Sequence, residues 1–220
     1  MVIASGKVHR VPLFLAFLDL MLVMSLFLAP LSQPEGSVTD LDANANWIDH
    51  SDRWSEMSLY PRIVYTFGDL NCHQFMDRTL ILNGNQMPVC SRDVSIFIGV
   101  MFGAILLTRA SAHDHPAMVF SSILPRRFRK GFFGKHPGIL FAAGIVLLLT
   151  PTALDGGVQA LSTMSLLPFG LEYESNNPTR ILTGFPMGMG VGMLVTSMLM
   201  SLLSRRDDGS DNLVMYVVKD

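Results

Sequence analysis

The sequence predicts an all-α integral membrane protein, a bundle of four transmembrane helices with an ordered outer loop that carries a Cys-His cluster. Half of the 220 residues are hydrophobic, and only 15% are charged. A soluble domain carries about a quarter charged residues. The charges lie between four apolar windows, which is typical of a polytopic membrane protein. The net charge of −2 provides no broad basic surface, which argues against a nucleic-acid partner.

The four apolar windows predict helices over residues 11–31, 93–109, 137–155 and 181–204. The second and third have short apolar cores, so flanking residues must complete the roughly 20 residues that a crossing requires. A signal peptide is the alternative for the first window. Its apolar stretch, however, exceeds the usual roughly 7–15 residues of such a peptide, so we expect an uncleaved helix.

The positions of Lys and Arg predict the orientation in the membrane. Basic residues flank the predicted helices in the N-terminal segment 1–10, the loop 110–136 and the tail 205–220. Four crossings put these segments on one side, and cytoplasmic segments are enriched in Lys and Arg. We therefore expect both termini in the cytoplasm of a cell membrane, with the loop 32–92 and the segment 156–180 outside.

Both cysteines lie in the second half of the outer loop. Cys72 is followed by His73, and Cys90 stands eighteen positions after Cys72. The turn signal Asn83-Gly84 predicts that the chain doubles back and brings the cysteines together. Asp93 stands three residues after Cys90, where the first turn of a helix would place the two side chains on one side.

This cluster allows three interpretations. The first is a Cys72–Cys90 disulfide, which suits an oxidising compartment. The second is a metal site with Cys72, His73, Cys90 and Asp93 as ligands, because thiolate, imidazole and carboxylate groups together suit zinc or iron. The third is a pair of buried thiols without chemistry. Adjacent Cys and His side chains diverge, which weakens the second interpretation unless the backbone bends sharply at Cys72.

A second polar patch is expected on the same face. Asp155 ends the third predicted helix, and Gly156-Gly157 permits a bend. The apolar stretch 158–169 is too short to cross a membrane, so it is expected to lie in the interface or to re-enter the membrane. Asp155, Gln159 and Arg180 can converge on the Cys-His loop. The alternative is an Asp155–Arg180 ion pair that holds two helix ends together.

Two further features lie inside the predicted helices. Gly184, Gly188 and Gly192 form a ridge that permits close helix packing. The partner is a helix of this chain, a second copy or another subunit of a membrane complex. Asp19 is costly in hydrocarbon, so it should face the bundle interior or a water-filled cavity. A carrier that uses Asp19 is one interpretation, although no inverted repeat is visible.

The outer residues resemble a known family. The first block is Cys72-His73-Gln74, Arg78 and Pro88-Val89-Cys90-Ser91-Arg92; the second is Pro151, Asp155, Gln159, Glu174-Ser175-Asn176, Arg180 and Thr183-Gly184. Over roughly 69–194 these blocks resemble the domain of unknown function 2085 family of uncharacterised prokaryotic polytopic membrane proteins. The family pattern has a further Cys where this chain has Asp93. A disulfide through that Cys would be lost here, whereas a metal site could keep a carboxylate ligand. The resemblance implies fold and placement but no activity.

The predicted topology puts both blocks on one face, so we expect one composite polar and thiol site there, in contact with the lipid bilayer. The catalytic candidates are Arg78, Asp155, Gln159 and Arg180, the binding candidates are Arg92, Ser175 and Asn176, and the metal candidates are Cys72, His73, Cys90 and Asp93. One hypothesis is a zinc- or iron-dependent enzyme acting on a lipid-linked or anionic substrate. The alternative is a non-enzymatic membrane-complex subunit or assembly factor with a disulfide or metal clasp.

Overall fold

The computed structural model describes residues 8–42, 47–125, 132–166, 168 and 171–217. Its α-helices and strands are α1 (Val11–Leu31), α2 (Ser51–Ser55), α3 (Leu59–Asn71), β1 (Thr79–Leu82), β2 (Asn85–Cys90), α4 (Ser91–Leu106), α5 (Pro116–Ser122), α6 (Phe132–Lys135), α7 (Pro137–Thr163) and α8 (Asn177–Val217). Short 3-10 turns cover Val8–Arg10, Met76–Arg78 and Leu107–Arg109. The basic run 126–131 lies outside the described residues.

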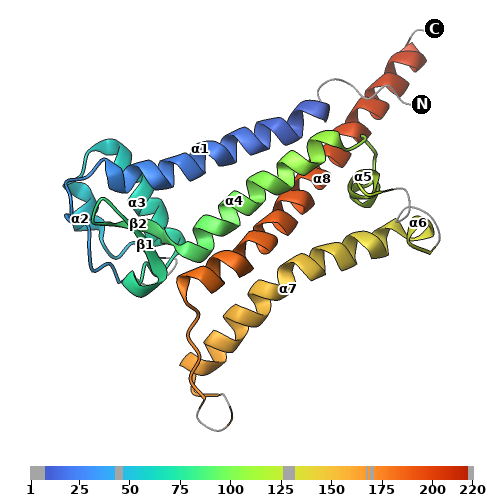
Figure 1. Ribbon diagram of the computed structural model, residues 1–220. Coiled ribbons are helices and arrows are strands. Elements are labelled where there is room, and N and C mark those ends of the chain that lie inside the picture. Colours follow the sequence, from blue (N-terminus) through green and yellow to red (C-terminus); the bar gives the residue numbers. More distant parts are fainter. Residues whose placement is uncertain (1–7, 43–46, 126–131, 167, 169–170, 218–220) are drawn as a thin grey trace.

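Four helical segments are long and apolar enough to cross a membrane, which confirms the predicted number. They are Val11–Leu31, Ser91–Arg109, Pro137–Thr163 and Asn177–Arg205. α1, α4 and α8 run side by side, and α7 runs beside α8 but lies farther from it at the end where α5 lies (Figure 1). The start of α1 and the far end of α8 lie at this same end. At the opposite end α2, α3 and the two strands form a cap over α1 and α4 (Figure 1).

The prediction of an all-α fold is wrong in one respect, because β1 and β2 form a small antiparallel sheet. The turn predicted at Asn83-Gly84 is confirmed. Both residues have positive φ, 53° and 69°, as a two-residue hairpin requires. Leu82 pairs with Asn85 across the turn. The hairpin returns the chain toward the end of α3 and places Cys90 directly before α4.

α7 continues past its expected end. The helix predicted to stop at Asp155 runs through Gly156-Gly157 to Thr163. Residues 158–163 therefore extend α7 instead of starting the interfacial or re-entrant segment that the sequence suggested. Glycines interrupt a membrane helix less than a soluble one, because neighbouring groups support the backbone there. The extension carries Gln159 one turn beyond Asp155, on the same face of the helix.

α4 and α8 make the closest helix contact in the bundle. A Cβ atom added at Gly188 would lie 1.9 Å from the carbonyl oxygen of Ile96, and one added at Gly99 would lie 2.3 Å from the carbonyl oxygen of Phe185. The two backbones therefore approach each other through glycines on both helices. The face formed by Gly184, Gly188 and Gly192 packs against α4 of the same chain. It is not free for the second copy or complex partner that the sequence allowed.

The cap has its own core of aromatic and polar side chains. Trp54 is 1% exposed, stacks on Tyr65 with ring centroids 4.9 Å apart, and donates a hydrogen bond from Nε1 to Asp69 (2.5 Å). The Tyr65 hydroxyl donates to the carbonyl oxygen of Gln86 (2.7 Å). This network ties α2 and α3 to β2, every residue of which is buried. It fixes the strand that leads to Cys90.

The contact between α4 and α8 yields a test with a matched control. Gly188→Ala places a methyl group against the Ile96 carbonyl, whereas a Cβ at Gly157 in α7 meets nothing within 4 Å. We expect Gly188→Ala to lower the free energy of unfolding by about 1–3 kcal/mol. Gly157→Ala should be neutral or stabilising, because alanine favours a helix by up to about 1 kcal/mol over glycine. Thermal unfolding in detergent, followed by circular dichroism, measures both. Equal effects would contradict the close contact.

Candidate functional site

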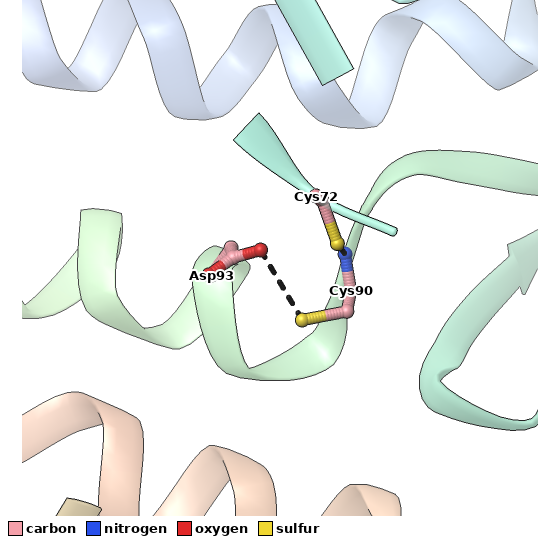
Figure 2. Close-up of side chains that lie close together, drawn as sticks. All are labelled: Cys72, Cys90 and Asp93. Atoms are coloured by element: carbon pink, nitrogen blue, oxygen red, sulfur yellow. Dashed lines mark hydrogen bonds between the residues drawn. The ribbon is translucent and has the colours of Figure 1, made fainter. Parts of the chain in front are cut away.

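Cys72, Cys90 and Asp93 form a compact group where the cap meets α4 (Figure 2). Cys72 follows α3, and Cys90 is the residue before the first turn of α4. One ligand atom from each of the three residues lies within 4.8 Å of the others. The Cys90 thiol donates to Asp93 Oδ2 (3.2 Å), and the Cys90 backbone N–H donates to Cys72 Sγ (3.2 Å). The convergence of these three side chains, expected from the hairpin and the helical spacing, is confirmed.

Both cysteines are buried free thiols, and their acidities differ. The hydrogen bond from Cys72 lowers the pKa of the Cys90 thiol. The same bond, together with burial, raises the pKa of Cys72. Cys90 also stands at the N-terminus of α4, where the helix dipole favours an anion. Cys90 is therefore the thiol that ionises first.

His73 lies outside this group. Cys72 has an extended backbone, with φ −144° and ψ 148°, so the next side chain points to the other side of the chain. The His73 ring is exposed and stacks on Phe75 with centroids 5.6 Å apart. Gln74 turns the chain with a φ of 52° and donates to the carbonyl oxygen of Pro88 (2.6 Å).

Asp155 organises the second polar patch. Its carboxylate accepts hydrogen bonds from Arg92 (2.5 Å), Tyr173 (2.7 Å), Ser175 (3.0 Å) and Thr183 (3.2 Å). These partners come from α4, from the segment before α8 and from α8 itself. The carboxylate raises the pKa of Tyr173, because it accepts the hydrogen bond of the neutral phenol. One buried acid in α7 thereby connects three parts of the chain.

Arg180 does not pair with Asp155 as the alternative interpretation suggested. Its Nη2 donates to Gln159 Oε1 (2.8 Å), and its Nε donates to the carbonyl oxygen of Ser175 (2.9 Å). Arg92 also reaches Gln159 Oε1, at 3.5 Å. Gln159 thus lies between the guanidinium groups of Arg92 and Arg180. Arg92 has a carboxylate partner, Asp155, whereas the oxygens that accept from Arg180 are neutral.

Two predicted site residues lie at the edge of the patch. Arg78 donates to Glu174 (2.9 Å), and its guanidinium lies 4.7 Å from the ring centroid of Phe75. Asn176 is exposed. Its side chain accepts a hydrogen bond from the Thr179 backbone N–H (2.9 Å), which caps the N-terminus of α8. The structure thus gives Asn176 a capping contact.

A cavity of about 690 Å³ joins the two patches. It is lined by residues from the cap and from three long helices: Asn71, Cys72, His73, Gln74, Phe75, Arg78, Cys90, Arg92, Asp93, Gly156, Gln159, Ala160, Thr163, Met164 and Arg180. Arg92 Nε and Gln159 Nε2 are buried without a hydrogen-bond partner among the described residues. Buried donors of this kind are costly unless a ligand or water binds them.

Sequence reasoning missed some partners in this network. Tyr173 and Thr183 both bind Asp155, and Ser91 binds Asn177 (2.7 Å) where α4 and α8 begin. Ser91 and Thr183 belong to the two blocks that resemble the family, and Tyr173 stands next to Glu174 of the second block. The sequence therefore drew attention to these positions but did not indicate which side chains they bind.

Four membrane-length helices and a polar cavity at one end of the bundle define a helical membrane protein with a composite site of thiols, arginines and carboxylates. The chain belongs to the family described as "Predicted membrane protein (DUF2085)", whose family model matches residues 72–194. That range contains the thiol group and the Asp155 network.

Two archaeal proteins, each named only as an uncharacterised protein, are similar to this chain. A protein of Methanothermobacter thermautotrophicus is 27% identical over 123 residues, which cover 56% of this chain and 82% of the relative. A protein of Methanocaldococcus jannaschii is 24% identical over 187 residues, which cover 85% of this chain and 91% of the relative. No solved structure matches the chain.

The Asp155 network predicts a large loss of stability when its charge is removed. Asp155→Asn leaves Arg92 largely buried without its carboxylate, and breaking a buried pair costs about 3–5 kcal/mol. Glu174→Gln removes the exposed partner of Arg78, which should cost about 1 kcal/mol or less. Denaturant unfolding of the two variants measures the difference. A similar small loss for both would refute the central position of Asp155.

The thiol pair predicts a pH dependence of alkylation. Because the pKa of Cys90 is lowered, its reaction rate in protein treated with a chelator should reach half its maximum below the ordinary thiol value of about 8.5. Cys72→Ala removes the hydrogen bond that lowers this pKa, so the midpoint should move to higher pH. Mass spectrometry after timed exposure to iodoacetamide identifies the modified residue. Modification of Cys72 before Cys90 in the unaltered protein would contradict the assignment.

Proposed function

We propose that this protein is a zinc-dependent membrane enzyme that acts on an anionic substrate at the outer membrane surface. The observation that carries the proposal is the position of Cys72, Cys90 and Asp93, three ligand atoms within 4.8 Å of one another on the wall of a cavity of about 690 Å³. Catalytic zinc sites have three protein ligands and keep one position open. Two thiolates and a carboxylate suit zinc.

The remainder of the cavity supports an anionic substrate. Arg78, Arg92 and Arg180 all line it, and arginines bind phosphate and carboxylate groups through several hydrogen bonds. The unpartnered donors of Arg92 and Gln159 add hydrogen-bonding capacity for the same group. A zinc ion bound beside them would polarise a substrate oxygen or activate water.

The distribution of charge supports the outward orientation. Arg10 precedes α1, Arg109 follows α4, and Arg205 ends the membrane-length part of α8. These ends of the three helices face away from the cap (Figure 1). Lys and Arg are enriched on the cytoplasmic side of membrane helices. The cap and the cavity would then face outward. The outer ends of α4, α7 and α8 contribute to the cavity, so a lipid-linked substrate could reach it from the bilayer.

A second candidate is a non-enzymatic subunit in which Cys72 and Cys90 form a disulfide clasp. It is favoured by the contact between the two residues, because Cys72 Sγ already accepts from the Cys90 backbone N–H. Such a bond would join the end of α3 to the start of α4. The protein has two cysteines in all, so its mass after alkylation with and without reductant separates this candidate from the metal site.

Metal analysis tests the proposed enzyme. Protein purified without chelator should contain about one zinc ion per chain, and Cys90→Ser and Asp93→Asn should each lose most of it. Asp52→Asn changes an exposed acid of the cap and should keep the metal. Inorganic phosphate, as a probe anion, should slow alkylation of Cys90 relative to chloride at the same ionic strength, and Arg180→Gln should weaken this protection. Metal-free protein with fully reactive thiols would refute the proposal.

A further inference from the structure

A second candidate site lies among the long helices, and two of its lining residues, Leu18 and Val195, are exposed at the surface. Asp19 is the ninth residue of α1 and lines a cavity of about 270 Å³ between α1, α4 and α8. Most of the lining is apolar, including Leu15, Leu22 and Val100. Asp19 Oδ2 is buried and has no hydrogen-bond partner among the described residues. An acceptor in this state is costly in hydrocarbon unless something donates to it.

We propose that the Asp19 cavity binds a lipophilic cation, with a protonated amine against the carboxylate and an alkyl chain against the leucines. Charge complementarity supports this occupant. Among the described residues that line the cavity, none is basic, so Asp19 is its one charged group. The apolar wall fits a hydrocarbon body, and the free carboxylate oxygen fits an N–H donor, with which it makes a charge-assisted hydrogen bond.

The lining argues against two other uses of Asp19. A path for protons or hydrated ions requires successive polar groups, and Thr196 is the one polar neighbour among the described residues of the cavity wall. A metal ion requires several oxygen ligands, whereas the wall offers one carboxylate and one hydroxyl group. An amine with an apolar tail needs only the acceptor and the hydrophobic surface that are present.

Photolabelling tests this proposal directly. The probe is a dodecylamine with a diazirine in its alkyl chain, added to the full-length protein in nanodiscs of zwitterionic lipid. The expected result is saturable labelling of peptides from α1, α4 and α8, which excess unlabelled dodecylamine suppresses. Asp19→Asn keeps the side-chain shape and removes the charge, so the half-saturating concentration should rise about tenfold or more. The diazirine analogue of dodecanol should label these peptides weakly in both proteins.

Two controls make the outcome decisive. Asp52→Asn makes the same chemical change in the cap and should leave labelling unaltered. Circular dichroism of Asp19→Asn checks that its helices are intact, and competition by dodecylamine in the unaltered protein tests the site without any substitution. Labelling that does not saturate, that survives Asp19→Asn unchanged, or that is equally strong with the alcohol would overturn the proposal.

Discussion

The close contact between α4 and α8 is the constraint on which the remaining structure depends. Their backbones approach so closely that a Cβ at Gly188 would lie 1.9 Å from the Ile96 carbonyl oxygen. This contact fixes the relative height of the two helices. It therefore sets the positions of Arg92 in the first turn of α4 and Arg180 in the first turn of α8. The cap is attached to α4 through β2, so the thiol group is aligned with the same two helices.

The sequence was sufficient for the features that rest on local patterns. Apolar windows located the long helices, Asn83-Gly84 located the hairpin, and the spacing of Cys90 and Asp93 placed their side chains together. The sequence was insufficient for features that tertiary contacts determine, such as the end of a helix or the burial of a side chain. Gly156-Gly157 predicts the end of a helix, yet α7 continues through both residues to Thr163. The buried position of Trp54 also depends on a tertiary contact, because Asp69 provides a buried acceptor for its indole N–H.

In the candidate site too, some features were predictable from the sequence and others depend on tertiary contacts. That residues of the two polar blocks line one cavity was predictable, because it follows from the number of crossings and from their order along the chain. Which arginine pairs with Asp155 was not predictable. Asp155 binds Arg92 rather than Arg180, since the α4–α8 contact brings Arg92 to α7. His73 is adjacent to Cys72 in sequence but diverges from it, because an extended backbone alternates its side chains.

The length of α7 has a consequence for the cavity wall. Its 27 residues extend about 40 Å, whereas the hydrocarbon layer of a bilayer is roughly 30 Å thick. The buried residues of α7 are Ile145, Asp155 and Gln159, so most of its surface is left for contact with lipid. The apolar part of α7, residues 138–154, accounts for only about 26 Å of this length, so the turns from Asp155 to Thr163 extend past the hydrocarbon layer. Gly156, Gln159 and Thr163 in these turns form one side of the cavity. The helix thus carries part of the cavity wall into the headgroup region of the bilayer.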